Sequence, residues 1–221
     1  MFKHAVIIAG GYGSRMRPLT DYLPKPLVKV NNQPLIKHVV DFLRTNGVQN
    51  ITVSYGYKGN MVLDEIHQLV ETFINTIDKD NSYFLFNTLV KHINEPIVVC
   101  PSDMIIELDL QKVYEEYINL NEPAACIVPV RTELDADSIV IDTTSSRITN
   151  ITREQSLGIY ASGIQILNPF KINELIPPFV NFYDVWRALI KKDSLYATKA
   201  MPTHWRVFDK LSDLSCYQNI Q

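Results

Sequence analysis

The residues best suited to chemistry follow the first apolar run of the chain, where Gly10, Gly11 and Gly13 precede Arg15 and Arg17. Glycines so close together permit positive φ angles and let a ligand approach the backbone closely. A turn with many free backbone N–H groups forms a concave anion site, and arginine suits bidentate contacts with phosphate oxygens. The segment therefore predicts a phosphate-binding loop.

The spacing of these glycines narrows the kind of loop. The segment lacks the Gly-Lys-Ser/Thr ending of a Walker loop and the Gly-x-Gly-x-x-Gly spacing of dinucleotide binders, which disfavours a nicotinamide-dependent dehydrogenase. Farther along, Pro24-Lys25-Pro26-Leu27 holds one lysine between two stiff prolines. A strand-to-helix turn with solvated arginines is an alternative for the glycines alone. The arginines and the Pro-Lys-Pro segment, in this order, favour phosphate binding.

Two aspartates follow strand-like segments of the chain. Asp103 follows the apolar run 97–100, and open α/β sheets bind ligands at the carboxyl ends of their strands. Asp209 follows a second strand-like segment and precedes a helix start. Mg²⁺ takes one or two carboxylates together with phosphates and waters, so a magnesium site needs few acidic residues. Either could instead cap its turn, and Asp213 is expected in the first turn of the last helix, where its charge suits the helix dipole.

Alternating strand and helix signals must position these groups. Continuous β-branched runs are typical of strands buried on both faces, and apolar residues at helical spacing indicate amphipathic helices. We expect strands over 5–9, 50–55, 96–100 and 124–130, and helices over 35–43, 61–77, 84–93 and 110–120. Such units imply a mainly parallel sheet covered on both faces. Shorter strands expected over 138–142, 147–151, 159–167 and 194–201 suggest a small α+β lobe that closes the site.

Length and composition are those of an ordinary soluble protein. A chain of 221 residues with 46% hydrophobic and 20% charged residues fits one domain, 1–221. The net charge of -3 gives no argument for nucleic acid or a membrane as partner. Three separated cysteines and no apolar stretch of ~20 residues lead us to expect a cytoplasmic protein. The oligomeric state stays open.

The compound pattern from Gly10 to Leu27 resembles the signature of the sugar-phosphate nucleotidyltransferases, which usually reads Gly-Gly-x-Gly-Thr-Arg-Leu, then Pro-Leu-Thr, then Pro-Lys-Pro-Leu. Ser14 and Met16 replace the usual Thr and Leu. The resemblance implies an α/β fold of the Rossmann-like αβα sandwich type. It also implies a Mg²⁺-dependent enzyme that moves a nucleoside monophosphate from a nucleoside triphosphate to a small phosphorylated acceptor and releases pyrophosphate.

The same resemblance implies roles for individual residues. Arg15 and Lys25 would carry the catalytic positive charge, and Asp103 and Asp209 would hold Mg²⁺. The nucleotide-binding set is expected to be Ala9, Gly10, Gly11, Gly13, Ser14, Arg15, Lys25, Asn81, Ser82 and Ser102. Arg153 and Gly163 are expected at the acceptor.

Two departures from the family pattern leave the base and the acceptor open. The base-reading turn of the family is replaced by Asp80-Asn81-Ser82-Tyr83, which is more like phosphocholine cytidylyltransferases, although Asn81 and Ser82 could equally cap a helix. The usual Glu-Lys-Pro is replaced by Thr152-Arg153-Glu154. Cytidylyl transfer is therefore favoured. Sugar-1-phosphate uridylyl, guanylyl or thymidylyl transfer is the alternative, and a nucleotide-sensing module without chemistry is a further one. The family's habits suggest cell-surface glycan biosynthesis.

Overall fold

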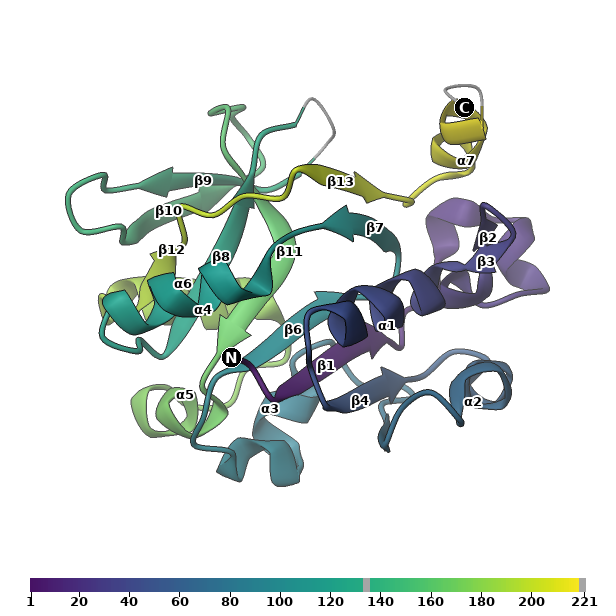
Figure 1. Cartoon of the computed structure of the whole chain (residues 1–221), viewed down its shortest axis with the longest axis horizontal. Helices are drawn as coiled ribbons and strands as arrows, with labels where there is room; N and C mark the ends of the chain where they lie inside the picture. The colour runs from purple at the N-terminus through teal and green to yellow at the C-terminus, as the bar shows by residue number, and fades with distance from the viewer. Residues whose placement is uncertain (133–135, 219–221) are drawn as a thin grey trace.

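The computed structural model describes residues 1–132 and 136–218, and within them a nine-stranded sheet forms the centre of the molecule (Figure 1). The main path of the sheet is β10-β9-β11-β6-β1-β4-β5, and β8 joins β11 and β12. Its strands are β1 (His4–Ala9), β4 (Asn50–Tyr55), β5 (Thr72–Asn75), β6 (Ile97–Pro101), β8 (Ala125–Val130), β9 (Ser138–Ile141), β10 (Ile148–Thr152), β11 (Tyr160–Leu167) and β12 (Leu195–Ala197).

Helices cover the sheet, and two short ribbons lie outside it. The helices are α1 (Leu35–Thr45), α2 (Gly59–Ile66), α3 (Tyr83–Asn87), α4 (Leu110–Asn119), α5 (Pro169–Leu175), α6 (Phe182–Lys191) and α7 (Leu211–Gln218). One ribbon pairs β2 (Lys29–Val30) with β3 (Gln33–Pro34). The other pairs β7 (Met104–Glu107) with β13 (His204–Val207), and β13 leads into α7 (Figure 1).

Successive side chains of a parallel strand point to opposite faces of the sheet, and an apolar run is therefore buried on both faces. In β1, Ala5 and Ile7 pack into the core cluster that contains α1, α2 and α4, whereas Val6 packs into the cluster that contains α3, α5 and α6. Strands β5, β4, β1 and β6 run parallel, and the sheet turns antiparallel at β11. The expected α/β sandwich is confirmed. The carboxyl ends of β1, β4, β5 and β6 meet at one edge, where such sheets bind ligands.

Two of the expected helices are wrong in extent. The helix expected over 61–77 ends at Ile66, and Thr72–Asn75 form β5, which pairs parallel with β4. Apolar spacing alone does not separate a half-buried edge strand from a helix, and here pairing with β4 decides the outcome. The helix expected over 84–93 is broken at Thr88, whose extended backbone ends α3 and whose hydroxyl caps the next turn by accepting from the Val90 N–H.

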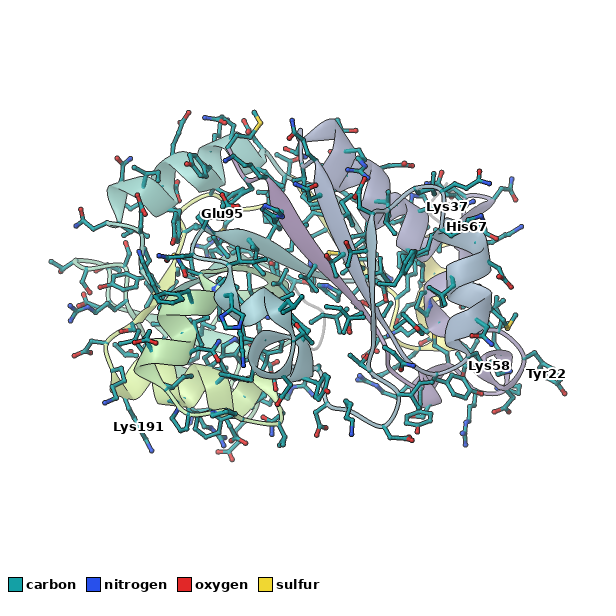
Figure 2. The ribbon with its side chains drawn as sticks, turned by 90° about the horizontal axis from the view of Figure 1, so that it is seen from below. Tyr22, Lys37, Lys58, His67, Glu95 and Lys191 are labelled. Carbon is teal, nitrogen blue, oxygen red and sulfur yellow. The ribbon has the colours of Figure 1, made fainter. Side chains whose placement is uncertain are left out.

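Charged side chains at the surface pair across neighbouring segments of the chain. Lys37 of α1 pairs with Glu65 of α2, close to His67 in Figure 2. Glu95, at the other end of the sheet edge in that view, pairs with His4 of β1 at 2.8 Å. No helix in the described part of the chain has the length and hydropathy to cross a membrane.

Candidate active site

A cavity at the carboxyl ends of β1 and β6 gathers most of the residues expected to bind a nucleotide. Its volume is about 370 Å³. It is lined by Ala9, Gly11, Gly13, Ser14, Arg15, Lys25, Asn81, Ser102, Asp103 and Asp209, with Ile8, Pro26 and Pro101. Residues from both ends of the chain therefore meet around one space.

Lys25 joins the two aspartates at the centre of this cavity. Its ammonium donates to Asp103 Oδ2 at 2.5 Å and to Asp209 Oδ1 at 2.7 Å. The Arg15 guanidinium contacts the other Asp209 oxygen, Oδ2, at 2.5 Å. Burial alone would lower the pKa of Lys25, but the two carboxylates outweigh it and raise that pKa, so the ammonium stays charged. The four groups form one charge cluster.

The phosphate loop wraps around the Lys25 side chain. Gly13 has a φ of 62°, in the left-handed region, and a Cβ there would meet Lys25 Cβ and Thr20 Cγ2 at 3.0 Å each. Thr20 donates its hydroxyl to the Gly13 carbonyl at 2.9 Å. Pro26 and Leu27, next to Lys25, are buried. The glycine therefore lets the loop close onto a lysine that its own turn holds in place.

The ribbon of β7 and β13 brings the two aspartates together. Asp103 lies between β6 and β7, and Asp209 follows β13 by two residues. Val207 pairs with Met104, and the Phe208 N–H donates to the Asp103 carbonyl at 2.9 Å. The carboxylates thus leave adjacent points of one antiparallel ladder, which explains why they can share a single ammonium.

The donor set fits a hard divalent cation. Within residues 1–132 and 136–218 there is no group of three His, Cys, Asp or Glu side chains able to hold a metal by themselves. Mg²⁺ needs only one or two carboxylates because phosphates and waters complete its octahedron. Asp103 and Asp209 already gather around one positive group, Lys25, so they are the residues that could hold Mg²⁺.

A second cavity adjoins the first and shares Arg15, Asp103 and Asp209 with it. The two residues expected at the acceptor, Arg153 and Gly163, both line it. Gly163 has a φ of 89°, and a Cβ there would meet Pro101 Cγ at 3.0 Å. Backbone conformation and space therefore both require glycine at this point of the wall.

Asp137 is a polar centre of this second cavity that the sequence did not single out. It accepts from Arg153 Nε at 2.5 Å and from the Tyr183 hydroxyl. Burial, together with the hydrogen bond to Asp137, raises the pKa of Tyr183 to about 12. Trp205 also lines the cavity, and its indole N–H donates to the Ser162 carbonyl at 2.9 Å. No local pattern marked Asp137 or Trp205 as site residues, because different elements bring them together.

A third cavity, on the other side of the glycine loop, lies between the ends of β4 and β5. Gly10, Tyr12, Gly56 and Asn81 are among its lining residues. Asn81 Oδ1 accepts from the Phe182 N–H at 3.2 Å, an orientation that leaves its NH₂ group as the donor for a ligand. Asn81 also lines the first cavity, so it stands between the two.

Ser82 requires a correction. The sequence predicts that it contacts the nucleotide, but it is fully buried and its hydroxyl donates to the Phe179 carbonyl at 2.7 Å. It lines none of these three cavities. The hydroxyl is used inside the protein, since a buried polar group needs a hydrogen-bond partner.

The wall of the third cavity is tied back to the loop by hydrogen bonds. Tyr12 donates its hydroxyl to Asp78 at 3.0 Å. Tyr57 donates its hydroxyl to the Thr20 carbonyl at 3.1 Å, and Lys58 donates to the Asp21 carbonyl. Figure 2 shows Lys58 close to Tyr22 at this end of the molecule. The loop and the segment after β4 therefore form one connected rim.

Gly56 is a further residue of this rim that sequence reasoning missed. A Cβ at Gly56 would lie 2.5 Å from the Gly10 carbonyl oxygen, which belongs to backbone and cannot swing away. We expect Gly56→Ala to lower the free energy of unfolding by about 1–3 kcal/mol, the usual cost of overpacking. Thermal unfolding measures this. Gly11→Ala is the control, because its Cβ would meet nothing within 4 Å. Equal melting temperatures for the two variants would contradict the prediction.

The profile of one protein family, described as nucleotidyl transferase, matches residues 4–152 of this chain. That span includes the phosphate loop, Lys25 and Asp103. The chain belongs to the nucleotidyl transferase family. The family assignment agrees with the position of the cavities at the carboxyl ends of the parallel strands.

Relatives of known activity match most of the chain at low identity. A mannose-1-phosphate guanyltransferase from Pichia angusta is 27% identical over 90% of this chain and 59% of its own length. A mannose-1-phosphate guanylyltransferase from Arabidopsis thaliana is 26% identical over 91% of this chain and 60% of its own length. This nucleotidyl transferase therefore spans about three fifths of the length of the curated relatives it matches.

Solved structures share the fold over nearly the whole chain. A CTP:phosphocholine cytidylyltransferase from Streptococcus pneumoniae superposes with a TM-score of 0.78 at 24% identity, covering 99% of each chain. An inositol-1-phosphate CTP transferase from T. maritima superposes with a TM-score of 0.75 at 18% identity, covering 98% of this chain and 94% of the other. At such identities the likeness shows the fold.

Proposed function

We propose that this nucleotidyl transferase moves a nucleoside monophosphate from a nucleoside triphosphate to a small sugar phosphate and releases pyrophosphate. The charge cluster of Lys25, Arg15, Asp103 and Asp209 carries the proposal. Three of its members, Arg15, Asp103 and Asp209, line both the cavity beneath the phosphate loop and the cavity that holds Arg153 and Gly163. A donor and an acceptor bound in these two spaces would place their phosphates on either side of the cluster.

The reaction needs little more than position and charge. An oxygen of the acceptor phosphate attacks the α-phosphorus in line, a new P–O bond forms, and the bond to the β-phosphate breaks with its electrons on pyrophosphate. No general base is required because the acceptor phosphate is ionised at neutral pH. Asp103 and Asp209 would hold Mg²⁺, which would supply charge neutralisation between the two polyanions. Lys25 and Arg15 supply fixed positive charge where negative charge develops.

Arg15 is the more exposed of the two cations in the cluster. Its side chain is 56% exposed, whereas that of Lys25 is 12% exposed. Its guanidinium is paired with the Asp209 carboxylate. A triphosphate in the first cavity offers bidentate partners that a single carboxylate oxygen does not. We therefore assign Arg15 to the triphosphate and Lys25 to the junction between metal and phosphates.

The acceptor cavity suits a polyhydroxylated molecule. Asp137 and Arg153 give it an acceptor and a donor, and Trp205 gives one apolar wall. Recognition of a quaternary ammonium uses a cage of aromatic rings, and Trp205 is the one aromatic side chain among the described residues of this lining. The cavity thus favours a sugar phosphate over phosphocholine as acceptor.

The relatives favour guanylyl transfer over the cytidylyl transfer that the sequence alone favoured. Curated proteins similar to the chain include mannose-1-phosphate guanyltransferases from fungi and plants, at 25–29% identity. GTP and a sugar 1-phosphate are accordingly the first substrate pair that we propose. Cytidylyl transfer is the second, supported by the Asn81 segment and its likeness to phosphocholine cytidylyltransferases.

Product analysis tests the proposal. The protein is incubated with Mg²⁺, one of GTP, CTP, UTP, dTTP or ATP, and pooled sugar 1-phosphates with phosphocholine added, and products are read by mass spectrometry. We expect a nucleoside-diphosphate sugar that forms with GTP and disappears on chelation. A cytidine conjugate instead would select the second candidate. Triphosphate binding without any conjugate would favour the nucleotide-sensing module and refute transfer.

A further inference from the structure

The backbone of Asp209 lies just past the end of the β7–β13 ribbon. Strand β13 ends at Val207, and its partner β7 begins at Met104, so Phe208 makes the last backbone bond of the ribbon. Asp209 lies beyond that bond. Lys25 and Arg15 contact its carboxylate, and its backbone is held by the next element of the chain, helix α7, which begins at Leu211.

Asp213, the third residue of α7, holds the N-terminus of this helix in place. Its Oδ2 accepts from the Asp209 N–H at 2.7 Å and from the Lys210 N–H at 2.8 Å. This is the carboxylate half of a capping box, displaced so that it also reaches the residue before the cap. Two amides held by one oxygen restrain the backbone of Asp209, and with it the direction of its side chain.

The helix that carries Asp213 is itself anchored beneath the phosphate loop. Phe208 is fully buried in a cluster with Met16 of the loop, and its ring lies edge-on to Tyr217 of α7 at 5.2 Å between centroids. Leu214 packs against the same cluster. Met16 directly follows Arg15, so this cluster connects the loop, Asp209 and α7 in one packed unit.

We propose that Asp213 is a positioning residue for the metal centre, acting through the Asp209 backbone rather than on the substrate. The inference rests on the proposed function, because it presumes that Asp209 holds a divalent cation. Partners of metal ligands are often worth 10–100-fold in metal affinity. Here the partner is Asp213, which binds the main-chain N–H of the proposed metal ligand Asp209. Helix α7 thus supports the site although it contributes no metal ligand.

The test compares two aspartates that each accept from two backbone N–H groups at the start of a helix. Asp109, the residue before α4, accepts from the Gln111 and Lys112 N–H groups, whereas Asp213 accepts from the two N–H groups that precede α7. Asp109 lines none of the three cavities described above. Mn²⁺ binding is measured by electron paramagnetic resonance with GTP present (or CTP, if wild type uses CTP) and no acceptor. We expect Asp213→Ala to weaken Mn²⁺ binding ~10-fold or more, and Asp109→Ala to leave it unchanged.

Three further measurements accompany this comparison. The melting temperature should fall by a few degrees in both alanine variants, since both lose a helix cap. Asp213→Asn should recover part of the Mn²⁺ affinity, because an amide oxygen still accepts an N–H. The turnover of Asp213→Ala should rise with added Mg²⁺ toward that of wild type.

Several outcomes would overturn the inference. Wild-type Mn²⁺ affinity in Asp213→Ala would do so, as would a change confined to the KM of the acceptor, because Asp213 also lines the acceptor cavity. A loss of Mn²⁺ affinity in Asp109→Ala equal to that in Asp213→Ala would show a general effect of instability. If wild type itself binds no Mn²⁺ with either triphosphate, the metal role of Asp209 fails first and this inference with it.

Discussion

Replacing Lys25 with alanine is expected to lower kcat by about 10²–10³-fold at saturating substrates, the usual cost of removing one preorganised charge. The ammonium stands between Asp103 and Asp209, which line both cavities, and its raised pKa keeps it charged. Alanine removes that charge where the α-phosphate and pyrophosphate would carry negative charge. Initial rates of product formation at saturating nucleoside triphosphate and sugar phosphate measure the effect.

Two companion variants give the Lys25 result its meaning. Lys25→Arg keeps the positive charge but replaces a compact ammonium with a planar fork, so its turnover should stay below wild type. Lys29→Ala removes a nearby exposed lysine of β2 and should leave kcat unchanged. Wild-type turnover in Lys25→Ala would show that Lys25 has no catalytic role.

Replacing Asp103 with asparagine is expected to reduce turnover by ~10³-fold or more, since metal stabilisation of the transition state amounts to several kcal/mol. The substitution removes the carboxylate that we propose as a metal ligand but keeps the shape of the side chain. The ribbon should survive, because Phe208 donates to the main-chain carbonyl of residue 103 and not to its side chain. Turnover is measured as a function of Mg²⁺ concentration, and the half-saturating Mg²⁺ concentration should rise.

The matched control for Asp103 is a carboxylate outside the site. Asp41 of α1 accepts from Gln33 at 2.7 Å, and Asp41→Asn should retain both turnover and Mg²⁺ dependence. An Asp103→Asn variant with the Mg²⁺ dependence of wild type would remove Asp103 from the metal site. Thermal unfolding of both variants shows whether the fold is kept.

Most of the residues that the sequence proposed for the site line one cavity, and those that are close together in the sequence were the easiest to propose. The phosphate loop is one continuous segment, so its glycines, Arg15 and Lys25 could be recognised from residue types alone. Asp103 could be found because a buried apolar run ends just before it. Asp209 was found by resemblance. The structure then placed it beside Asp103 through the pairing of β7 with β13.

The features that the sequence did not predict depend on partners far along the chain. Residues 72–75 have helical spacing on paper but pair with β4 in the sheet. In the sequence, Ser82 has no visible hydrogen-bond partner, but in the structure its hydroxyl donates to the Phe179 carbonyl, 97 positions away. Asp137 and Trp205 carry no local signal, and they meet in one cavity only because of the topology. Local patterns hold no information about such meetings.

The bonds that Lys25 makes to Asp103 and Asp209 have a consequence for the synthesis of this protein. They span 78 and 184 positions of the chain. Closing such long loops costs entropy that local contacts do not, so these contacts form late in folding. Domains emerge from the ribosome N-terminal end first. In a growing chain, the phosphate loop is therefore synthesised long before Asp209, the second carboxylate that Lys25 contacts. The complete charge cluster forms only after β13, which precedes Asp209, has paired with β7.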